Sequence, residues 1–240
     1  MSPKWFIVHN PVSGIQRAGI VKKAVERRFL QAGLDFEIYQ TTGETDVTQV
    51  VRDACLHGYN RFVAVGGDGT VDAVADVLAG TQIPLGIIPA GTGNGLARDL
   101  KIPLSVRAAL DILLGEHCIR RIDLIQLGSQ FRTLNLSVGL TADVIRDMRQ
   151  EDKRRLGLAA YLVGGISKIF RAKPLLLELI IDGELQDFRT TEVLLLNSPI
   201  FREPILDWHE DVIIDDGELD LFVFPAVDSL NFLQTVWNFL

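Results

Sequence analysis

The feature that most constrains the fold is an apolar run that breaks into a glycine-rich turn, Val63-Ala64-Val65-Gly66-Gly67-Asp68-Gly69-Thr70-Val71. Because glycine has no Cβ, successive N–H groups can turn toward a ligand, and Asp68 can face a magnesium ion beside phosphate groups. Thr70 adds a hydroxyl donor. Residues 72–78 have the apolar spacing of a helix, whose N-terminal dipole also favours anions. The run predicts a strand, a phosphate-binding turn and a helix in succession.

Two further loops bear on this interpretation. Taken alone, Gly66, Gly67 and Gly69 could serve only a tight strand-to-helix turn. A second apolar strand, however, leads into a glycine-rich loop at 91–95, and Trp5–His9 lead into Asn10-Pro11-Val12-Ser13-Gly14. Because the carboxyl ends of parallel strands meet at one edge of a sheet, three such turns would form a single ligand site there.

Together these loops resemble the diacylglycerol kinase catalytic-domain family, which includes sphingosine and ceramide kinases and bacterial lipid kinases. The resemblance covers nearly the whole chain and rests on Asn10–Gly14, Gly66–Thr70, Gly91–Asn94 and Ile122-Asp123-Leu124. Phosphofructokinases and NAD kinases share the Gly-Gly-Asp-Gly loop, so the first and third loops are what narrow the assignment.

The order of the expected elements predicts an α/β fold in two parts. Strands and helices alternate at first, which indicates a doubly wound, mostly parallel three-layer domain at 1–118, similar to phosphofructokinase and NAD kinase. Residues 119–240 are expected to form a mainly antiparallel β-sandwich domain for the lipid substrate. The expected strands are 4–9, 34–40, 61–65, 83–88, 121–127, 132–137, 175–181, 191–196 and 219–224, and the expected helices are 16–32, 45–58, 70–80, 104–115, 152–171 and 228–240.

Composition excludes several classes of protein. A chain of 240 residues with 48% hydrophobic content can bury a substantial core, and a net charge of −7 argues against a nucleic-acid partner. Cys55 and Cys118 suggest neither a disulfide framework nor a zinc site and fit a reducing compartment. No apolar stretch reaches the roughly 18 to 20 residues that span a bilayer, and the N-terminus lacks a signal-peptide pattern. We expect a cytoplasmic protein, peripheral at the inner membrane surface.

The resemblance implies an ATP- and Mg²⁺-dependent kinase that transfers the γ-phosphoryl group to a hydroxyl of a membrane lipid, most simply diacylglycerol or a related glycerolipid. It implies Asp68 as the carboxylate on the metal side and Asp123 as a supporting one. For Thr41 the simpler alternative is a turn in which Thr45 caps the next helix. The residues expected at the nucleotide are Asn10, Ser13, Thr41, Gly66, Gly67, Asp68, Gly69, Thr70, Thr92 and Asn94.

Two Asp-Gly-Glu triplets match other positions of the family. Asp182-Gly183-Glu184 has the chemistry of a hairpin tip. The second triplet lies in Ile214–Leu221, and there the resemblance implies a structural magnesium held by the Asp216 carboxylate and the backbone oxygens of Ile213 and Glu218. Oxygen ligands suit a hard cation, although a plain β-turn accounts for the same sequence.

Departures from the family pattern leave other functions open. Gly95 stands where many diacylglycerol kinases carry Asp, and Asn197-Ser198-Pro199 replaces a glycine-rich turn, so a sphingoid-base kinase is one alternative. A soluble-substrate kinase of the NAD kinase type is another, although its Asn-Glu motif is not evident. The resemblance places the general base beyond Leu240, so a chain that binds nucleotide without turnover is a third. As partners we expect a membrane lipid, transient contact with the membrane surface and, as an assembly to test, a homodimer.

Overall fold

The computed structural model describes residues 2–14, 18–139, 174–199 and 212–225. The chain divides into two compact units, residues 1–134 with 213–217 and residues 135–212 with 218–240. A parallel α/β part followed by an antiparallel part confirms the predicted fold class. The domain boundary expected after residue 118 stays a prediction.

Four parallel strands form the central sheet of the first unit, in the order β2-β1-β3-β4. They are β1 (Lys4–His9), β2 (Asp35–Gln40), β3 (Arg61–Gly66) and β4 (Leu85–Pro89), each within two residues of its predicted bounds. The register pairs His9 with Val65 and Gly66 with Pro89, so β1, β3 and β4 end together at one edge. This edge carries all three glycine-containing loops.

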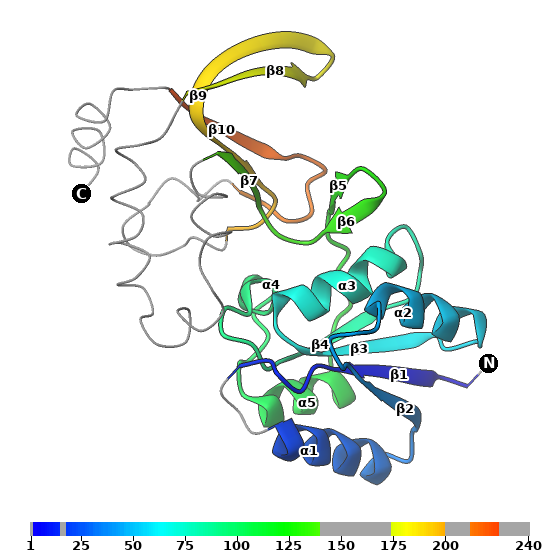
Figure 1. The fold of residues 1–240 in the computed structure, drawn as a ribbon. Coiled ribbons are helices and arrows are strands. Elements are labelled where there is room, and N and C mark those ends of the chain that lie inside the picture. The colour runs from blue at the N-terminus through cyan, green and yellow to red at the C-terminus, as the bar shows by residue number, and fades with distance from the viewer. Residues whose placement is uncertain (1, 15–17, 140–173, 200–211, 226–240) are drawn as a thin grey trace. The chain divides into compact units, whose positions relative to one another are not determined.

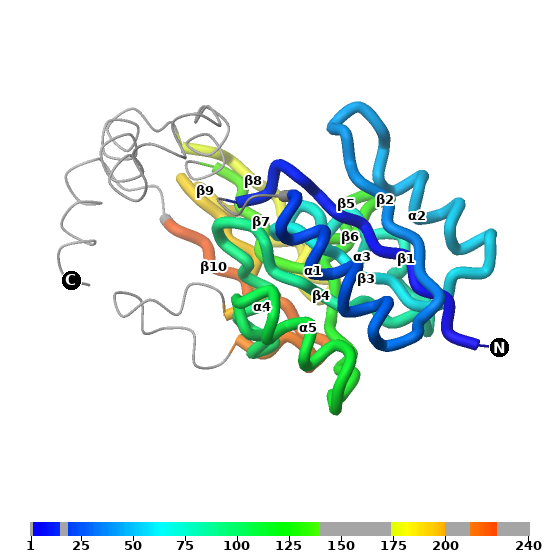
Figure 2. The backbone as a smooth tube through the Cα atoms, turned by 90° about the horizontal axis from the view of Figure 1, so that it is seen from below, coloured from blue at the N-terminus to red at the C-terminus, as the bar shows by residue number. Residues whose placement is uncertain are grey.

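Helices cover both faces of this sheet (Figures 1 and 2). One face packs against α1 (Ala18–Gln31) and α5 (Val106–Leu114), and the other against α2 (Val47–Leu56) and α3 (Asp68–Leu78). Side chains of β1 and β3 alternate between the two cores, as the period of a strand requires. Ile7, Val63 and Val65 belong to the core under α1 and α5, whereas Phe6, Val8, Phe62 and Ala64 belong to the core under α2 and α3.

Three details of the first unit differ from the sequence-based expectation. Helix α3 begins at Asp68, directly after Gly67, and not at residue 70 as we expected. A short helix α4 (Gly95–Asp99) lies where we expected only a loop. Asp46, and not Thr45, caps α2, since its carboxylate accepts hydrogen bonds from the Thr48 N–H at 2.9 Å and the Thr48 hydroxyl at 2.7 Å.

The first unit also contains a small antiparallel ribbon of β5 (Ile125–Leu127) and β6 (Gln130–Arg132). Residues 121–124, which we expected to begin a strand, have no regular secondary structure. The ribbon lies beside α3 (Figure 1), and carboxylates of that helix bind backbone N–H groups at and just after β6.

The second unit contains an antiparallel sheet of β7 (Leu136–Gly139), β8 (Leu175–Ile181), β9 (Glu184–Leu196) and β10 (Asp220–Pro225). The 13-residue β9 is longer than expected because its first half pairs with β8 and its second half with β7 and β10. Asp182 and Gly183 have φ of 51° and 87°, which confirms the predicted two-residue hairpin turn. The helices expected at 152–171 and 228–240 lie outside the described residues.

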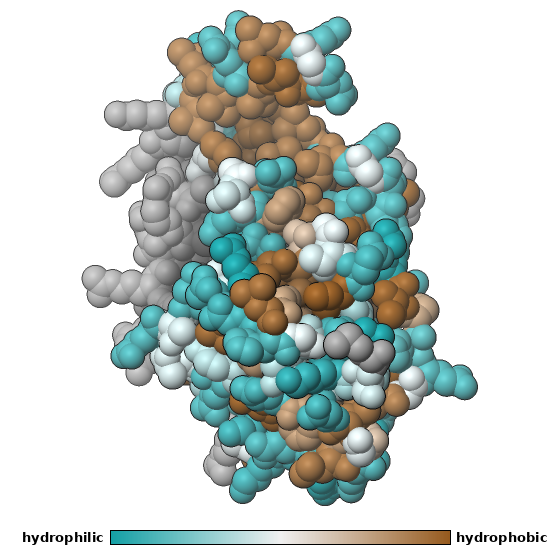
Figure 3. All heavy atoms as spheres, turned by 90° about the vertical axis from the view of Figure 1, so that its right-hand side faces the viewer, coloured by the Kyte–Doolittle hydropathy of each residue, from teal (hydrophilic) through white to brown (hydrophobic). Residues whose placement is uncertain are grey.

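One face of the β8–β9 hairpin exposes apolar side chains (Figure 3, top). Leu176, Ile180 and Leu185 are 82%, 74% and 64% exposed, and Ile180 lies directly opposite Leu185. The acidic pair Glu178 and Asp187 lies between them on the same face. In the part of the chain that the structure describes, none of the helices has both the length and the hydropathy to span a bilayer.

The aromatic cluster beneath α1 gives a stability prediction. Phe29 is fully buried and its ring lies 5.4 Å from that of Trp5 and 5.3 Å from that of Phe36. Phe29→Ala should lower the free energy of unfolding by about 3–5 kcal/mol through lost contacts and a cavity. The control is Leu30→Ala at a 69% exposed position of the same helix, which should stay within about 0.5 kcal/mol. Equal losses in urea unfolding of both variants would contradict the assignment of this core.

Candidate functional site

Three loops leave the carboxyl edge of the parallel sheet, and backbone hydrogen bonds fix where they start. The first loop is Asn10–Gly14, the second is Gly66–Thr70 and the third is Gly91–Asn94. The Asn10 N–H donates to the Val65 carbonyl at 2.9 Å, and the Ala90 N–H donates to the Gly66 carbonyl at 2.8 Å. Neighbouring loops therefore leave the sheet in register.

The loops pack backbone against backbone. A Cβ added to Gly91 would lie 2.4 Å from Gly67 Cα, and one added to Gly14 would lie 2.2 Å from the Ala90 carbonyl oxygen. No side chain fits at such distances. Gly14 also has a φ of 67°, which favours glycine. These glycines are required for the loops to meet, independently of any ligand.

Asn10 and Thr70 join the first loop to the second. The Asn10 Nδ2 donates to Thr70 Oγ1 at 3.2 Å, while Asn10 Oδ1 accepts from the Val12 N–H at 3.1 Å. Thr70 is 6% exposed, and a Cβ on Gly66 would lie 2.4 Å from its hydroxyl oxygen. The structure thus places Asn10 and Thr70 together and gives both a part in shaping the loops.

Asn94 shapes the third loop from within. Its backbone is left-handed, with φ 52° and ψ 47°, and the residue is 8% exposed. The side-chain oxygen accepts from the Gly91 N–H at 2.8 Å and the side-chain nitrogen donates to the Gly91 carbonyl at 2.9 Å. Arg98 donates from Nε to the Gly93 carbonyl at 3.0 Å and so also holds the third loop.

Asp68 is the carboxylate that lies among the loops. It is half-buried in the first turn of α3, and a Cβ added to Gly93 would lie 2.9 Å from its Oδ2. The neighbouring Gly69 differs from the other loop glycines, because no atom of the described residues lies within 4 Å of a Cβ built there. The space beside Gly69 is open to a ligand at a helix N-terminus, where N–H groups favour anions.

The other predicted nucleotide residues lie near the same edge. Thr41 follows β2, and its N–H donates to the His9 carbonyl at 2.9 Å. The Ser13 N–H donates to the Asn10 carbonyl at 3.4 Å within the first loop. Thr92 is exposed in the third loop. Their contacts with a nucleotide stay predictions.

Asp123 lies with the turn at 213–217. Its Oδ2 accepts from the Gly217 N–H at 2.7 Å, and its own N–H donates to the Ile214 carbonyl at 2.8 Å. Arg120 binds Asp215 in the same turn through two hydrogen bonds of 2.7 Å and 2.5 Å, and these lower the pKa of the Asp215 carboxyl. The hydrogen bonds described for Asp123 hold this turn, and its part in the reaction stays a prediction.

The predicted structural-metal residues Ile213, Asp216 and Glu218 are each exposed and lie within six residues of the chain. Among the described residues, no three His, Cys, Asp or Glu side chains are grouped as a metal site. The predicted set uses one carboxylate and two backbone oxygens and does not need such a group. The donors are all oxygen, which is the chemistry that Mg²⁺ requires.

Sequence reasoning did not single out Asp72 and Asp76, which follow Asp68 at intervals of four residues on α3. Asp72 Oδ1 accepts from the Thr133 N–H at 2.9 Å and from its hydroxyl at 2.6 Å. Asp76 Oδ1 accepts from the Phe131 N–H at 2.6 Å. The four-residue spacing of these aspartates was the signal in the sequence that could have grouped them, because residues four apart share a helix face.

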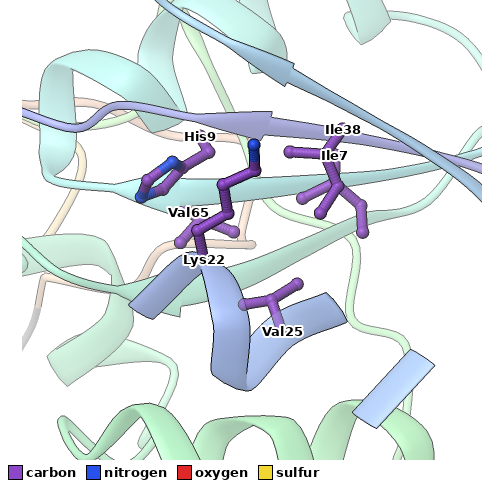
Figure 4. A pocket seen from close by; sticks show the side chains of 6 residues that line it. All are labelled: Ile7, His9, Lys22, Val25, Ile38 and Val65. Carbon is purple, nitrogen blue, oxygen red and sulfur yellow. The ribbon is translucent and has the colours of Figure 1, made fainter. Parts of the chain in front are cut away.

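His9 ends β1 immediately before the first loop and is 3% exposed, so it is packed inside the protein. In Figure 4 the Lys22 side chain rises from α1 toward β1, beside His9 and Ile7. Burial lowers the pKa of His9, the charge of Lys22 lowers it further, and Glu26 opposes them. The imidazole is therefore neutral at pH 7.

Glycine loops at the carboxyl edge of a parallel sheet, with a helix N-terminus between them, define the class of α/β proteins built to bind phosphate groups. The family model described as the diacylglycerol kinase catalytic domain matches residues 4–127. The chain belongs to this family of kinases.

Individual relatives agree with this membership. A protein named "Probable lipid kinase YegS-like" from Pseudomonas fluorescens is 34% identical over 218 residues, which cover 88% of this chain and 70% of the relative. A protein named diacylglycerol kinase from Bacillus subtilis is 30% identical over 237 residues, covering 95% and 76%. A crystal structure of a diacylglycerol kinase from Bacillus anthracis has the same fold, with a TM-score of 0.75, 23% identity and coverage of 98% and 77%.

The contact between the second and third loops gives a prediction about binding. In Gly91→Ala the new Cβ would push the third loop away from Gly67, and nucleotide affinity should fall at least about tenfold, or about 1.4 kcal/mol. Gly19→Ala is the matched control, because it adds the same methyl at an open position of α1. Calorimetric titration with a non-hydrolysable ATP analogue compares the two. Unchanged affinity in Gly91→Ala would show that the loops do not form the site together.

The buried His9 gives a prediction about pH. Its folded-state pKa lies below the ordinary value of 6.5, so the unfolded chain takes up the proton first as the pH falls. The stability contributed by neutral His9 is present above 6.5 and is lost as the pH falls toward the folded-state pKa. Between about pH 7.5 and about pH 5.5, the wild type should lose more stability in urea unfolding than His9→Gln does. Equal losses would mean that His9 is not the responsible group.

Proposed function

We propose that this protein is an ATP-dependent lipid kinase that transfers the γ-phosphoryl group to a hydroxyl of diacylglycerol or a related glycerolipid. The observation that carries the proposal is the open space at Gly69 beside the half-buried Asp68, at a helix N-terminus. The packing glycines explain how the loops meet, but packing gives no reason for a glycine at 69. A phosphate chain lying against the N–H groups of the second loop does give one.

Each loop has a part in this proposal. The backbone of the second loop and the start of α3 would bind phosphate oxygens, with Thr70 and Asn10 holding that loop to the first. Ser13, Thr41 and Thr92 would contact the nucleotide from the same edge, and Asn94 would hold the shape of the third loop through its bonds to Gly91. Phosphoryl transfer depends mainly on such positioning and on neutralisation of charge.

Magnesium is the cation that we propose alongside ATP. Asp68 offers a carboxylate next to the space where the phosphates would lie, and Mg²⁺ is commonly held by one or two carboxylates together with substrate phosphates. When bound there, it would neutralise phosphate charge. Asp123 would support the site through the 213–217 turn, where Asp216 with the Ile213 and Glu218 carbonyls would hold a second, structural cation.

A lipid acceptor implies transient contact with a membrane surface, and we propose such contact without a spanning segment. The exposed apolar residues of the β8–β9 hairpin would suit the interface. The same face carries the acidic Glu178 and Asp187 and the basic Arg189, so acidic charge is in excess there. We therefore expect contact with neutral, diacylglycerol-containing surfaces rather than recruitment by anionic lipid alone. The proposed location is the cytoplasmic side of the membrane.

Two other functions remain to be separated from this one. Gly95 at the start of α4 leaves a sphingoid base as an alternative acceptor. A chain that binds nucleotide but transfers nothing is the second alternative. The soluble NAD kinase type is set aside, because the chain belongs to the diacylglycerol kinase family.

The test measures transfer of labelled phosphate from ATP in Mg²⁺ to mixed micelles containing diacylglycerol or sphingosine. Gly69→Ala should keep the stability of the wild type but weaken ATP binding at least about tenfold, because its methyl would occupy the space of the phosphates. Asp68→Asn should lower kcat by about a hundredfold or more by removing the charge from the site. Gly19→Ala is the matched control and should change neither value.

The outcomes separate the candidates. Transfer to diacylglycerol that is lost in Asp68→Asn supports the proposal, and transfer to sphingosine alone would replace the acceptor. ATP binding without transfer to either lipid would leave only the nucleotide-binding function. Full ATP affinity in Gly69→Ala would remove the observation on which the phosphate site rests.

A further inference from the structure

The three carboxylates of α3 lie in a row, and two of them bind a single segment of chain. Asp68, Asp72 and Asp76 are spaced by four residues, so they form one stripe along the helix. Asp68 faces the third loop, whereas Asp72 and Asp76 accept hydrogen bonds from Thr133 and Phe131. One helix face thus carries both the proposed metal-side carboxylate and a backbone anchor.

The anchor is partly buried, with Asp72 and Phe131 half-buried. Thr133 is fully buried and Asp76 is 9% exposed. Carboxylates in such surroundings are stable only when donors satisfy them, and here backbone N–H groups and a threonine hydroxyl do so. Because the donors are backbone groups, the bonds fix the path of the chain itself.

The order of the contacts gives the path a direction. The Phe131 N–H donates to Asp76, and the Thr133 N–H donates to Asp72, which is one helical turn closer to Asp68. The chain therefore runs along α3 toward the helix N-terminus, where the phosphate-binding loops lie. Two residues later, at Asn135, it passes into the second compact unit.

We propose that Asp72 and Asp76 are positioning residues for phosphoryl transfer: they hold Phe131–Thr133, the last described segment before the second unit, on the helix that begins at Asp68. The proposal rests on the proposed kinase function. Loss of the two anchors frees the entry of the chain into the second unit, which would bind the lipid under the proposed function, without altering the loops that bind nucleotide. Transfer to lipid then slows while nucleotide binding is kept.

The test compares the double variant Asp72→Ala/Asp76→Ala with Asp72→Asn/Asp76→Asn, in which an amide oxygen can still accept the same N–H bonds. Asp46→Ala is the matched control, because Asp46 also accepts from the N–H and the hydroxyl of one threonine, in the same unit but at α2. Each protein is measured for lipid-dependent kcat, for affinity toward a non-hydrolysable ATP analogue and for hydrogen exchange at the amides of Phe131 and Thr133.

In the double alanine variant we expect kcat to fall at least about tenfold and exchange at both amides to accelerate, with nucleotide affinity within about twofold of wild type. The asparagine variant should keep at least about half of the wild-type kcat, and Asp46→Ala should leave both amides protected. Unchanged kcat with accelerated exchange would overturn the proposal. A loss of nucleotide affinity in the double alanine variant as large as its loss of kcat would also overturn it. So would a loss of kcat in Asp46→Ala equal to that of the double alanine variant.

Failure of the proposed function gives a different result. If the wild type binds the ATP analogue but transfers phosphate to no lipid, the kinase proposal fails. The anchor is then judged by exchange alone: the amides of Phe131 and Thr133 should exchange faster in the double alanine variant than in the wild type, with Asp46→Ala close to the wild type. If exchange does not differ between these proteins, the anchor proposal fails. If the wild type does not bind the analogue at all, both proposals fail.

Discussion

The close approach of two glycine backbones underlies the rest of the site. Gly67 and Gly91 meet at a distance that leaves no room for a Cβ on Gly91, and this contact holds the second and third loops together at the sheet edge. Close-packed backbones cannot adjust as flexible side chains do, so this contact sets the spacing of the two loops independently of a ligand. Asn10, Thr70 and Asn94 then use their hydrogen bonds within and between the loops. Loops whose spacing is set in this way suit a reaction that depends on positioning.

Helix α3 is the element on which the two proposals meet. Its first turn contributes to the phosphate site, and its next two turns hold the chain that leads to the second unit. Placing like charges four residues apart costs roughly 0.2–0.5 kcal/mol per pair, whereas a hydrogen bond to a charged group contributes about 1.5–3 kcal/mol. The hydrogen bonds therefore outweigh the repulsion, and the helix tolerates three aspartates on one face.

Much of the fold could be predicted because its signals are local. The four parallel strands, the Asp182-Gly183 turn and the family of the chain all follow from short patterns of apolar residues and glycine. The sequence could not separate glycines that pack from glycines that face a ligand, since Gly67, Gly69 and Gly91 have the same chemistry. Only their neighbours in space distinguish Gly69, which is open, from the other two. The start of α3 and the cap of α2 were missed because a shift of one or two residues leaves the local pattern almost unchanged. The helix α4 was missed because five residues are too few to show a helical period.

The sequence by itself determined the parallel sheet, the three loops at its edge and the kinase family, because strand periodicity and glycine-rich turns act over a few neighbouring residues. Tertiary structure decided the partners of the polar side chains. It brought Asn10 to Thr70, Asp72 to Thr133 and Asp123 to Gly217, across separations of 60, 61 and 94 residues. Such pairs leave no trace in local sequence, because a hydrogen bond depends on distance in the folded chain and not on position along it.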